Sequence, residues 1–224
     1  MIETTLFVAA MAVIVTAAVS AGLCYRRLRE KNRQIAALQK EAEAARTLDE
    51  TTELLNYPTF VKAAHIQIKL VRRHKWPVTL MVLDIDNLEK INLHHSYRVG
   101  DEALRHLAAA LRSVVRSSDV LGRFGGSGFF LLMPECDQDH ILNVFTRIRK
   151  KLQEPLKLES EKSLTLKFRA GAVTMYGLHA QLRPMMELAE KALDMAKESD
   201  SSLKIVDQDG IEIKSVEMIT EESE

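Results

Sequence analysis

SDVLGRFGGSGFFLLMP, residues 118–134, consists of two short and mainly apolar runs separated by GGSG. Apolar runs of this length bounded by glycines are typical of strands, and a short glycine-rich connection joins antiparallel neighbours. The stretch therefore predicts a β-hairpin with Ser127 and Gly128 at its tip. A hairpin in the middle of the chain makes a sheet the organising element of the fold.

Segments on both sides of this hairpin alternate between helical and strand-like periodicity. Apolar residues spaced by three and four predict helices over residues 60–75, 99–116, 139–152 and 183–199. Apolar runs or period-two alternation predict strands over residues 78–86 and 163–173, and two short strands within residues 203–216. This order predicts an α+β fold, a mainly antiparallel sheet with helices on its faces.

Composition limits the possible partners and cofactors. The chain has 224 residues and balances 31 Lys and Arg against 31 Asp and Glu, so it does not resemble a protein that binds DNA or RNA through its net charge. We therefore expect one folded domain and no nucleic-acid partner. Cys24 and Cys136 lie far apart and outside any C-x-x-C pattern, which argues against a disulfide scaffold or a zinc site.

The N-terminus predicts a membrane anchor over residues 1–25. No side chain from Thr4 to Tyr25 is charged, and about 20 residues of helix suffice to cross a bilayer. A cleaved signal peptide is the alternative, but no basic region precedes the apolar stretch, and Leu23 before Cys24 is a poor lipoprotein-type processing site. Five basic residues follow within Arg26–Arg33, so the rest of the chain is expected on the cytoplasmic side of a single-pass anchor.

Residues 26–48 are rich in Ala, Glu, Lys, Arg and Gln, which predicts a linker helix. Its apolar positions form a thin heptad seam: Leu28, Ile35, Leu38, Ala42 and Ala45. Two alternatives remain open, a coiled-coil-like pairing that makes a homodimer and a solvated single helix. The folded domain is then expected over residues 49–206, and a terminal hairpin with an acidic tail over residues 207–224.

Several motifs in the same order resemble one known family. LDIDNLEKINLHHSYRVGDEAL (residues 83–104) followed by RFGGSGFFLLMP (residues 123–134) is similar to the GGDEF domain of diguanylate cyclases, and DETTELLNYPTF (residues 49–60) resembles the start of that domain. The resemblance runs from about Asp49 to about Lys204. It implies a palm-like sheet related to nucleotide cyclases, in which two GTP-loaded domains and magnesium produce cyclic di-GMP. It also implies a bacterial inner membrane as the bilayer for the predicted anchor.

The catalytic positions of that family are altered in this chain. Asp84, with the backbone carbonyl of Ile85, matches one metal position, whereas Ser127 stands where the second carboxylate belongs and Gly128 replaces the next acid. A neutral hydroxyl does not replace a carboxylate as a magnesium ligand, and general-base assistance alone contributes about 10²- to 10⁴-fold in rate. We therefore expect a degenerate domain that is not a cyclase and requires no cofactor or magnesium.

Two more positions around the GTP site point the same way. Glu89 stands where the family has a phosphate-contacting Lys, although Lys90 is adjacent, and Ser201 stands where the family has a phosphate-facing Arg. Lys197 matches the family pattern. These departures indicate that the triphosphate site is vestigial.

Two residues of the family's guanine pocket are kept. Asn92 and Asp101 match positions that hydrogen-bond the guanine edge, and a pair of this kind discriminates a base well. Residual GTP or GDP binding is one interpretation. The other is structural, because an acid is favoured at the start of a helix and an Asn suits the end of a short one.

A second site of the family is better preserved. Arg116 and Asp119 form the R-x-x-D of its product-inhibition site, and Arg147 matches a secondary basic contact. In that site the Arg binds guanine O6 and N7 and the Asp accepts from the opposite guanine edge. The alternative is a surface Arg/Asp pair three residues apart near a helix end.

Other polar and aromatic residues have simpler interpretations. His94 and His95 have no third ligand in view and are expected in a solvated loop, and Trp76 is expected to anchor packing. Arg123 is expected to pair with an acid or a phosphate.

These inferences lead to one main functional prediction and two alternatives. The main prediction is a membrane-anchored cyclic di-GMP receptor that passes its signal to a protein partner. The first alternative is a docking module that binds no nucleotide, and the second is a weak cyclase.

Overall fold

The computed structural model describes residues 25–35, 46–158 and 163–217. The chain forms two compact units, Met1–Arg46 and Thr47–Glu224. In the first unit, residues 25–35 are helical, as expected for the start of the linker. The predicted anchor and most of the heptad seam lie outside the described residues. Among the described residues, no helix combines the length and apolar character needed to cross a membrane.

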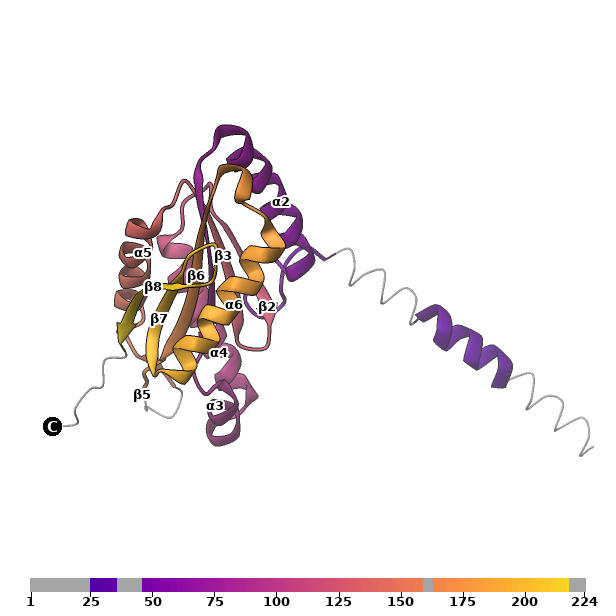
Figure 1. The fold of residues 1–224 in the computed structure, drawn as a ribbon. Coiled ribbons are helices and arrows are strands. Elements are labelled where there is room, and N and C mark those ends of the chain that lie inside the picture. Colours follow the sequence, from indigo (N-terminus) through magenta and orange to yellow (C-terminus); the bar gives the residue numbers. More distant parts are fainter. Residues whose placement is uncertain (1–24, 36–45, 159–162, 218–224) are drawn as a thin grey trace, which may run out of the picture. The chain divides into compact units, whose positions relative to one another are not determined.

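The second unit is built on a six-stranded sheet with the order β2-β3-β1-β6-β7-β8 (Figure 1). Its strands are β1 Pro77–Ile85, β2 Val120–Gly125, β3 Gly128–Pro134, β6 Phe168–Tyr176, β7 Ser201–Val206 and β8 Glu212–Glu217. All pairings in this sheet are antiparallel except that of β6 with β7, which confirms the prediction of a mainly antiparallel sheet. A separate pair is formed by β4 Leu156–Lys157 and β5 Ser163–Leu164.

Helices cover both faces of this sheet (Figure 1). They are α2 Tyr57–His74, α3 Leu88–His95, α4 Tyr97–Val114, α5 Gln138–Lys151 and α6 Leu182–Glu198, with a 3₁₀ turn η1 Gly177–His179. Buried side chains of α4 and α5 form one core, and those of α2 and α6 form the other. The palm-like α+β architecture is therefore present.

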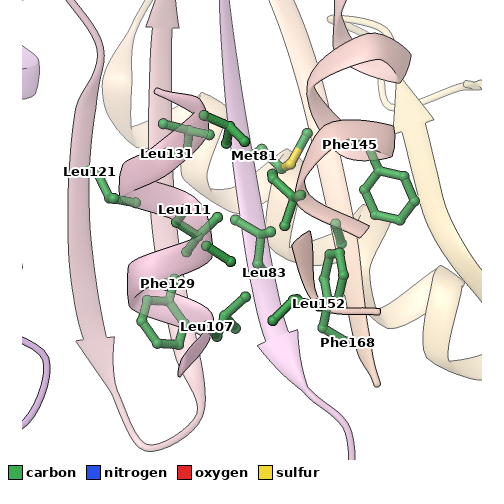
Figure 2. Packing of buried hydrophobic residues seen from close by; sticks show 14 of the residues in the cluster. Met81, Leu83, Leu107, Leu111, Leu121, Phe129, Leu131, Phe145, Leu152 and Phe168 are labelled. Atoms are coloured by element: carbon green, nitrogen blue, oxygen red, sulfur yellow. The ribbon is translucent and has the colours of Figure 1, made fainter. Parts of the chain in front are cut away.

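The central strand β1 contributes to both cores because successive side chains of a strand point to opposite faces. Met81 and Leu83 lie on the α4 and α5 side, where Figure 2 shows them close to Leu107, Leu111 and Phe145. Alternate residues of the same strand pack on the α2 and α6 side. This double burial holds the carboxyl end of β1, where Asp84 lies, in a fixed place.

Helix α4 differs from its sequence prediction at its start. We expected it to begin at residue 99, with Asp101 in its first turn as one interpretation of that acid, but it begins at Tyr97, and its first turn contains no acid. The physical reason is Ser96, whose positive φ of 125° turns the chain between α3 and α4 and so sets the start of the helix earlier. Asp101 consequently lies inside α4.

The N-terminal loop of the domain is tied to the hairpin. Arg123, only 8% exposed, places Nη1 3.0 Å from Asp49 Oδ1 and donates from Nη2 to the carbonyl of Gly126. Arg123 thus pairs with an acid, one of the two expected partners. Trp76 was expected to anchor packing; it is 36% exposed and stacks on His74 at the end of α2 with ring centroids 4.4 Å apart.

Candidate functional site

The three residues matched to the product-inhibition site line one surface cleft of about 190 Å³. Arg116 and Asp119 come from the turn that follows α4, and Arg147 comes from the face of α5 that closes the other side. The end of β3 and the loop after it complete the lining. The fold therefore brings Arg147 to two residues that lie about thirty positions earlier in the sequence.

The turn that carries Arg116 and Asp119 is closed by the backbone. Oδ2 of Asp119 accepts a hydrogen bond from the backbone N–H of Arg116 at 2.7 Å. Within the part of the chain that the structure describes, no ion pair involves the Arg116 guanidinium. The Asp119 carboxylate thus bonds to the backbone N–H of Arg116, whereas the alternative of a surface Arg/Asp pair requires a bond to the Arg116 side chain.

Burial in the cleft raises the pKa of the Asp119 carboxyl, although the Arg116 amide and guanidinium oppose the rise. A partly desolvated carboxylate is costly unless hydrogen-bond donors satisfy it. Burial also raises the pKa of the nearby Cys136 thiol to about 11, so that this thiol stays protonated near neutral pH. The cleft thus places the partly buried Asp119 carboxylate, which can accept further hydrogen bonds, beside two guanidinium groups.

A second polar site lies at the other end of the sheet, where β1 ends. In the register of β1 with β3, Asp84 lies opposite Gly128, and the backbone N–H of Ile85 donates to the carbonyl of Ser127 at 3.4 Å. Lys197 of α6 forms an ion pair with Asp84. The structure therefore brings together four residues that the sequence assigned to the vestigial catalytic site.

Comparison with known proteins identifies the family. The family model described as "Diguanylate cyclase, GGDEF domain" matches residues 46–202. The chain belongs to the GGDEF family. It is 30% identical over 154 residues to diguanylate cyclase DosC of Escherichia coli (strain K12), across 67% of this chain and 33% of that protein. It is 28% identical over 166 residues to the probable diguanylate cyclase DgcC of the same organism, across 74% of this chain and 44% of that one. The chain thus spans less than half the length of either relative.

Solved structures show the same GGDEF fold. The GGDEF domain of DgcB from Caulobacter crescentus, crystallised in complex with c-di-GMP, matches with a TM-score of 0.67 and 22% identity over 73% of this chain and 96% of that one. Diguanylate cyclase SiaD of Pseudomonas aeruginosa, crystallised with its activator SiaC, matches with a TM-score of 0.67 and 22% identity over 92% of this chain and 81% of that one.

The two residues expected to form a guanine pocket lie on α3 and α4, Asn92 on the first helix and Asp101 on the second. Asn92 lies inside α3, not at its end, and its Oδ1 is buried with no hydrogen-bond partner among the described residues. Gly100 of α4 lies so close that a Cβ there would be 1.9 Å from this oxygen. Asp101 follows Gly100 and is half-buried. Neither residue has the helix-end role that was the structural alternative for it.

The two acids at the carboxyl end of β1 in the GGDEF domain already have cationic partners. Among the described residues, no group of three or more His, Cys, Asp or Glu side chains is placed to hold a metal. Asp84 is engaged by Lys197, and Asp86 lies 3.1 Å from Nε of Arg169. The Ser127 hydroxyl adds no charge to this set.

Two other polar residues of the cleft were not predicted from the sequence. His140 and Asn143 of α5 line it together with Arg147. Asp137 caps α5 by accepting from the backbone N–H of His140 at 3.1 Å, and its Oδ1 also lies 2.6 Å from Nδ1 of that ring. The hydrogen bonds from His140 lower the pKa of Asp137. The available signal was spacing, because residues 140, 143 and 147 fall on one face of a helix.

Proposed function

We propose that this GGDEF protein is a catalytically inactive receptor for cyclic di-GMP that binds its ligand in the cleft of Arg116, Asp119 and Arg147. The observation that carries the proposal is the gathering of these three residues in one cleft. The cleft carries charged groups that can bind a guanine and a phosphate, whereas Ser127 and Gly128 stand at the positions where a cyclase has acids.

Each residue of the cleft has a chemical role in this proposal. The Arg116 guanidinium donates two parallel hydrogen bonds to guanine O6 and N7, which no other base presents as a pair of acceptors. The Asp119 carboxylate accepts from N1–H and the amino group on the opposite edge of a guanine. Arg147 supplies the positive charge that a bridging phosphate requires.

The signalling context is also part of the proposal. Residues 4–25 anchor the protein in the bacterial inner membrane, the domain faces the cytoplasm, and residues 26–48 connect the two, with a homodimer as one arrangement. Binding in the cleft changes how the protein meets a protein partner. The assembly of the related SiaD with a protein activator supports a partner of this kind.

Calorimetric titration of the purified full-length protein with cyclic di-GMP tests the proposal. We expect saturable binding in the micromolar range that Arg147→Ala weakens and Arg149→Ala, a matched change two residues away on the same helix and outside the cleft, leaves intact. Absence of binding at tens of micromolar would contradict the receptor function and favour the docking module. Sustained synthesis of cyclic di-GMP from GTP and magnesium would contradict the loss of catalysis.

A further inference from the structure

Five charged side chains meet where β1 ends, and we call them the strand-end cluster. They are Asp84, Asp86, Arg169, Lys197 and Asp200. Three carboxylates face two cations within this cluster. Arg169 and the two acids that precede α3 are mostly buried, with side chains 17%, 16% and 12% exposed for Arg169, Asp84 and Asp86.

Arg169 contacts three other residues of the strand-end cluster. Its Nε lies 3.1 Å from Oδ2 of Asp86, and its Nη2 lies 2.7 Å from Oδ1 of Asp200. Its Nη1 also donates to the backbone carbonyl of Lys197 at 2.9 Å. One guanidinium therefore connects β6 to the chain beyond β1 and to the turn that joins α6 to β7.

The register of the sheet fixes this arrangement. Asp84 of β1 lies directly opposite Arg169 of β6, and the backbone N–H of Asp86 donates to the carbonyl of Lys167 at 2.9 Å. Both acids are thus held against the strand that carries the guanidinium. Backbone hydrogen bonds, and not a side-chain contact alone, therefore place Asp84 and Asp86 beside β6.

A divalent cation meets two obstacles in the strand-end cluster. It must displace the ammonium or guanidinium group that already pairs with the acids, and a displaced cation that stays nearby repels it. Charges act strongly on each other in a partly buried site because water screens them poorly. Magnesium also gives up its hydration water reluctantly, so it competes poorly for acids that already have partners.

We propose that Arg169 and Lys197 are internal counter-ions that close the former metal site, so that restoring an acid at the hairpin tip does not restore metal binding while Arg169 is present. The replacement of the catalytic acids and the closure of the site are then two separate changes. This inference is independent of whether the cleft of Arg116 binds cyclic di-GMP.

Manganese binding tests the inference without any requirement for catalysis. The free Mn²⁺ signal in electron paramagnetic resonance reports metal bound to the full-length protein. We expect wild type and Ser127→Asp to bind Mn²⁺ equally weakly, within about twofold, and the double variant Ser127→Asp/Arg169→Gln to bind it about tenfold more tightly. Ser127→Asp/Arg183→Gln is the matched control, because Arg183 forms an exposed pair with Glu187 away from this site.

Two results would overturn the inference. One is binding by Ser127→Asp alone that equals binding by the double variant, and the other is a folded double variant that gains no affinity. If the double variant does not fold, Ser127→Asp alone still decides: Mn²⁺ binding by this variant that is tighter than in wild type and that an added Asp84→Asn abolishes would show an open metal site, whereas binding no tighter than in wild type supports closure by Arg169 and Lys197. Titration with cyclic di-GMP is a separate measurement, so this test and that of the receptor function fail independently.

Discussion

The cleft beside α5 and the strand-end cluster differ in how their charges are satisfied. In the cleft, the Asp119 carboxylate bonds to a backbone amide, and the guanidinium of Arg116 forms no ion pair within the described part of the chain. In the strand-end cluster, each of the acids Asp84, Asp86 and Asp200 has a cationic partner. A charge without an internal partner is available to a ligand, whereas a paired charge contributes to holding the fold together.

The largest expected effect is on cyclic di-GMP affinity, which should depend on the cleft and not on the strand-end cluster. Arg116→Ala removes a two-pronged contact to guanine, a kind of contact worth about 1 to 3 kcal/mol, and is expected to weaken cyclic di-GMP binding by about 5- to 150-fold. Lys197→Ala, in the strand-end cluster, is expected to change this affinity less than twofold. Calorimetry on both variants checks the difference. Equal losses of affinity in the two variants would show that binding of cyclic di-GMP does not distinguish the cleft from the strand-end cluster.

This separation was only partly visible in the sequence. The R-x-x-D motif and the altered hairpin tip are local patterns, so Arg116, Asp119 and Ser127 were assigned from sequence. The role of Arg169 was not, because it follows from the register of β1 with β6, which joins residues more than eighty positions apart. His140 was missed for a related reason, since only the packing of α5 places it in the cleft.

Prediction of the fold from the sequence has the same limit, because local patterns do not specify every strand pairing. Periodicity predicted most of the elements and the mainly antiparallel sheet. It missed the short helix α3, in whose last turn His94 and His95 lie, although these residues were expected in a loop. It did not predict that β7 would pair in parallel with β6, or that β8 would extend the same sheet at its edge. The parallel pairing of β6 with β7 depends on the long connection through α6, whose path no local pattern specifies, whereas β8 follows β7 through a short turn and so joins whichever sheet contains β7.

The next largest effect is expected from Asp119→Asn, which should lower the affinity for cyclic di-GMP and raise the stability of the fold. Asp119→Asn keeps the size of the side chain and an acceptor for the Arg116 amide, but removes the charge that guanine donors require. We expect affinity for cyclic di-GMP to fall about tenfold, because hydrogen bonds to charged groups are worth about 1.5 to 3 kcal/mol.

The same variant, Asp119→Asn, is expected to be more stable than wild type although it binds cyclic di-GMP less tightly. Burial raises the pKa of Asp119 in the folded protein, so its charge destabilises the fold at neutral pH. Asp119→Asn is therefore expected to raise the free energy of unfolding by up to about 1 kcal/mol in urea titrations. A loss of both affinity and stability would instead indicate a structural residue.

A smaller effect is expected from pH. Protonation removes the Asp119 acceptor, and the raised pKa means that this occurs at a higher pH than for an ordinary Asp with a pKa of 3.8. Affinity for cyclic di-GMP should therefore decline as the pH is lowered toward the raised pKa of Asp119, and Asp119→Asn should flatten this dependence. An unchanged slope in that variant would assign the titration to another group of the cleft.

The smallest effect concerns the hairpin tip, where an added charge meets the strand-end cluster. Ser127→Asp places a carboxylate beside Asp84 in a cluster that already holds more acids than cations. We expect this like-charge contact to lower the free energy of unfolding by about 0.3 to 1 kcal/mol at low salt, and added salt to reduce the loss. Ser127→Asn is the neutral control of similar size and should leave stability within about 0.5 kcal/mol. A stabilising Ser127→Asp would mean that the cations of the cluster are not saturated, and would weaken the contrast between a closed catalytic end and an open cleft.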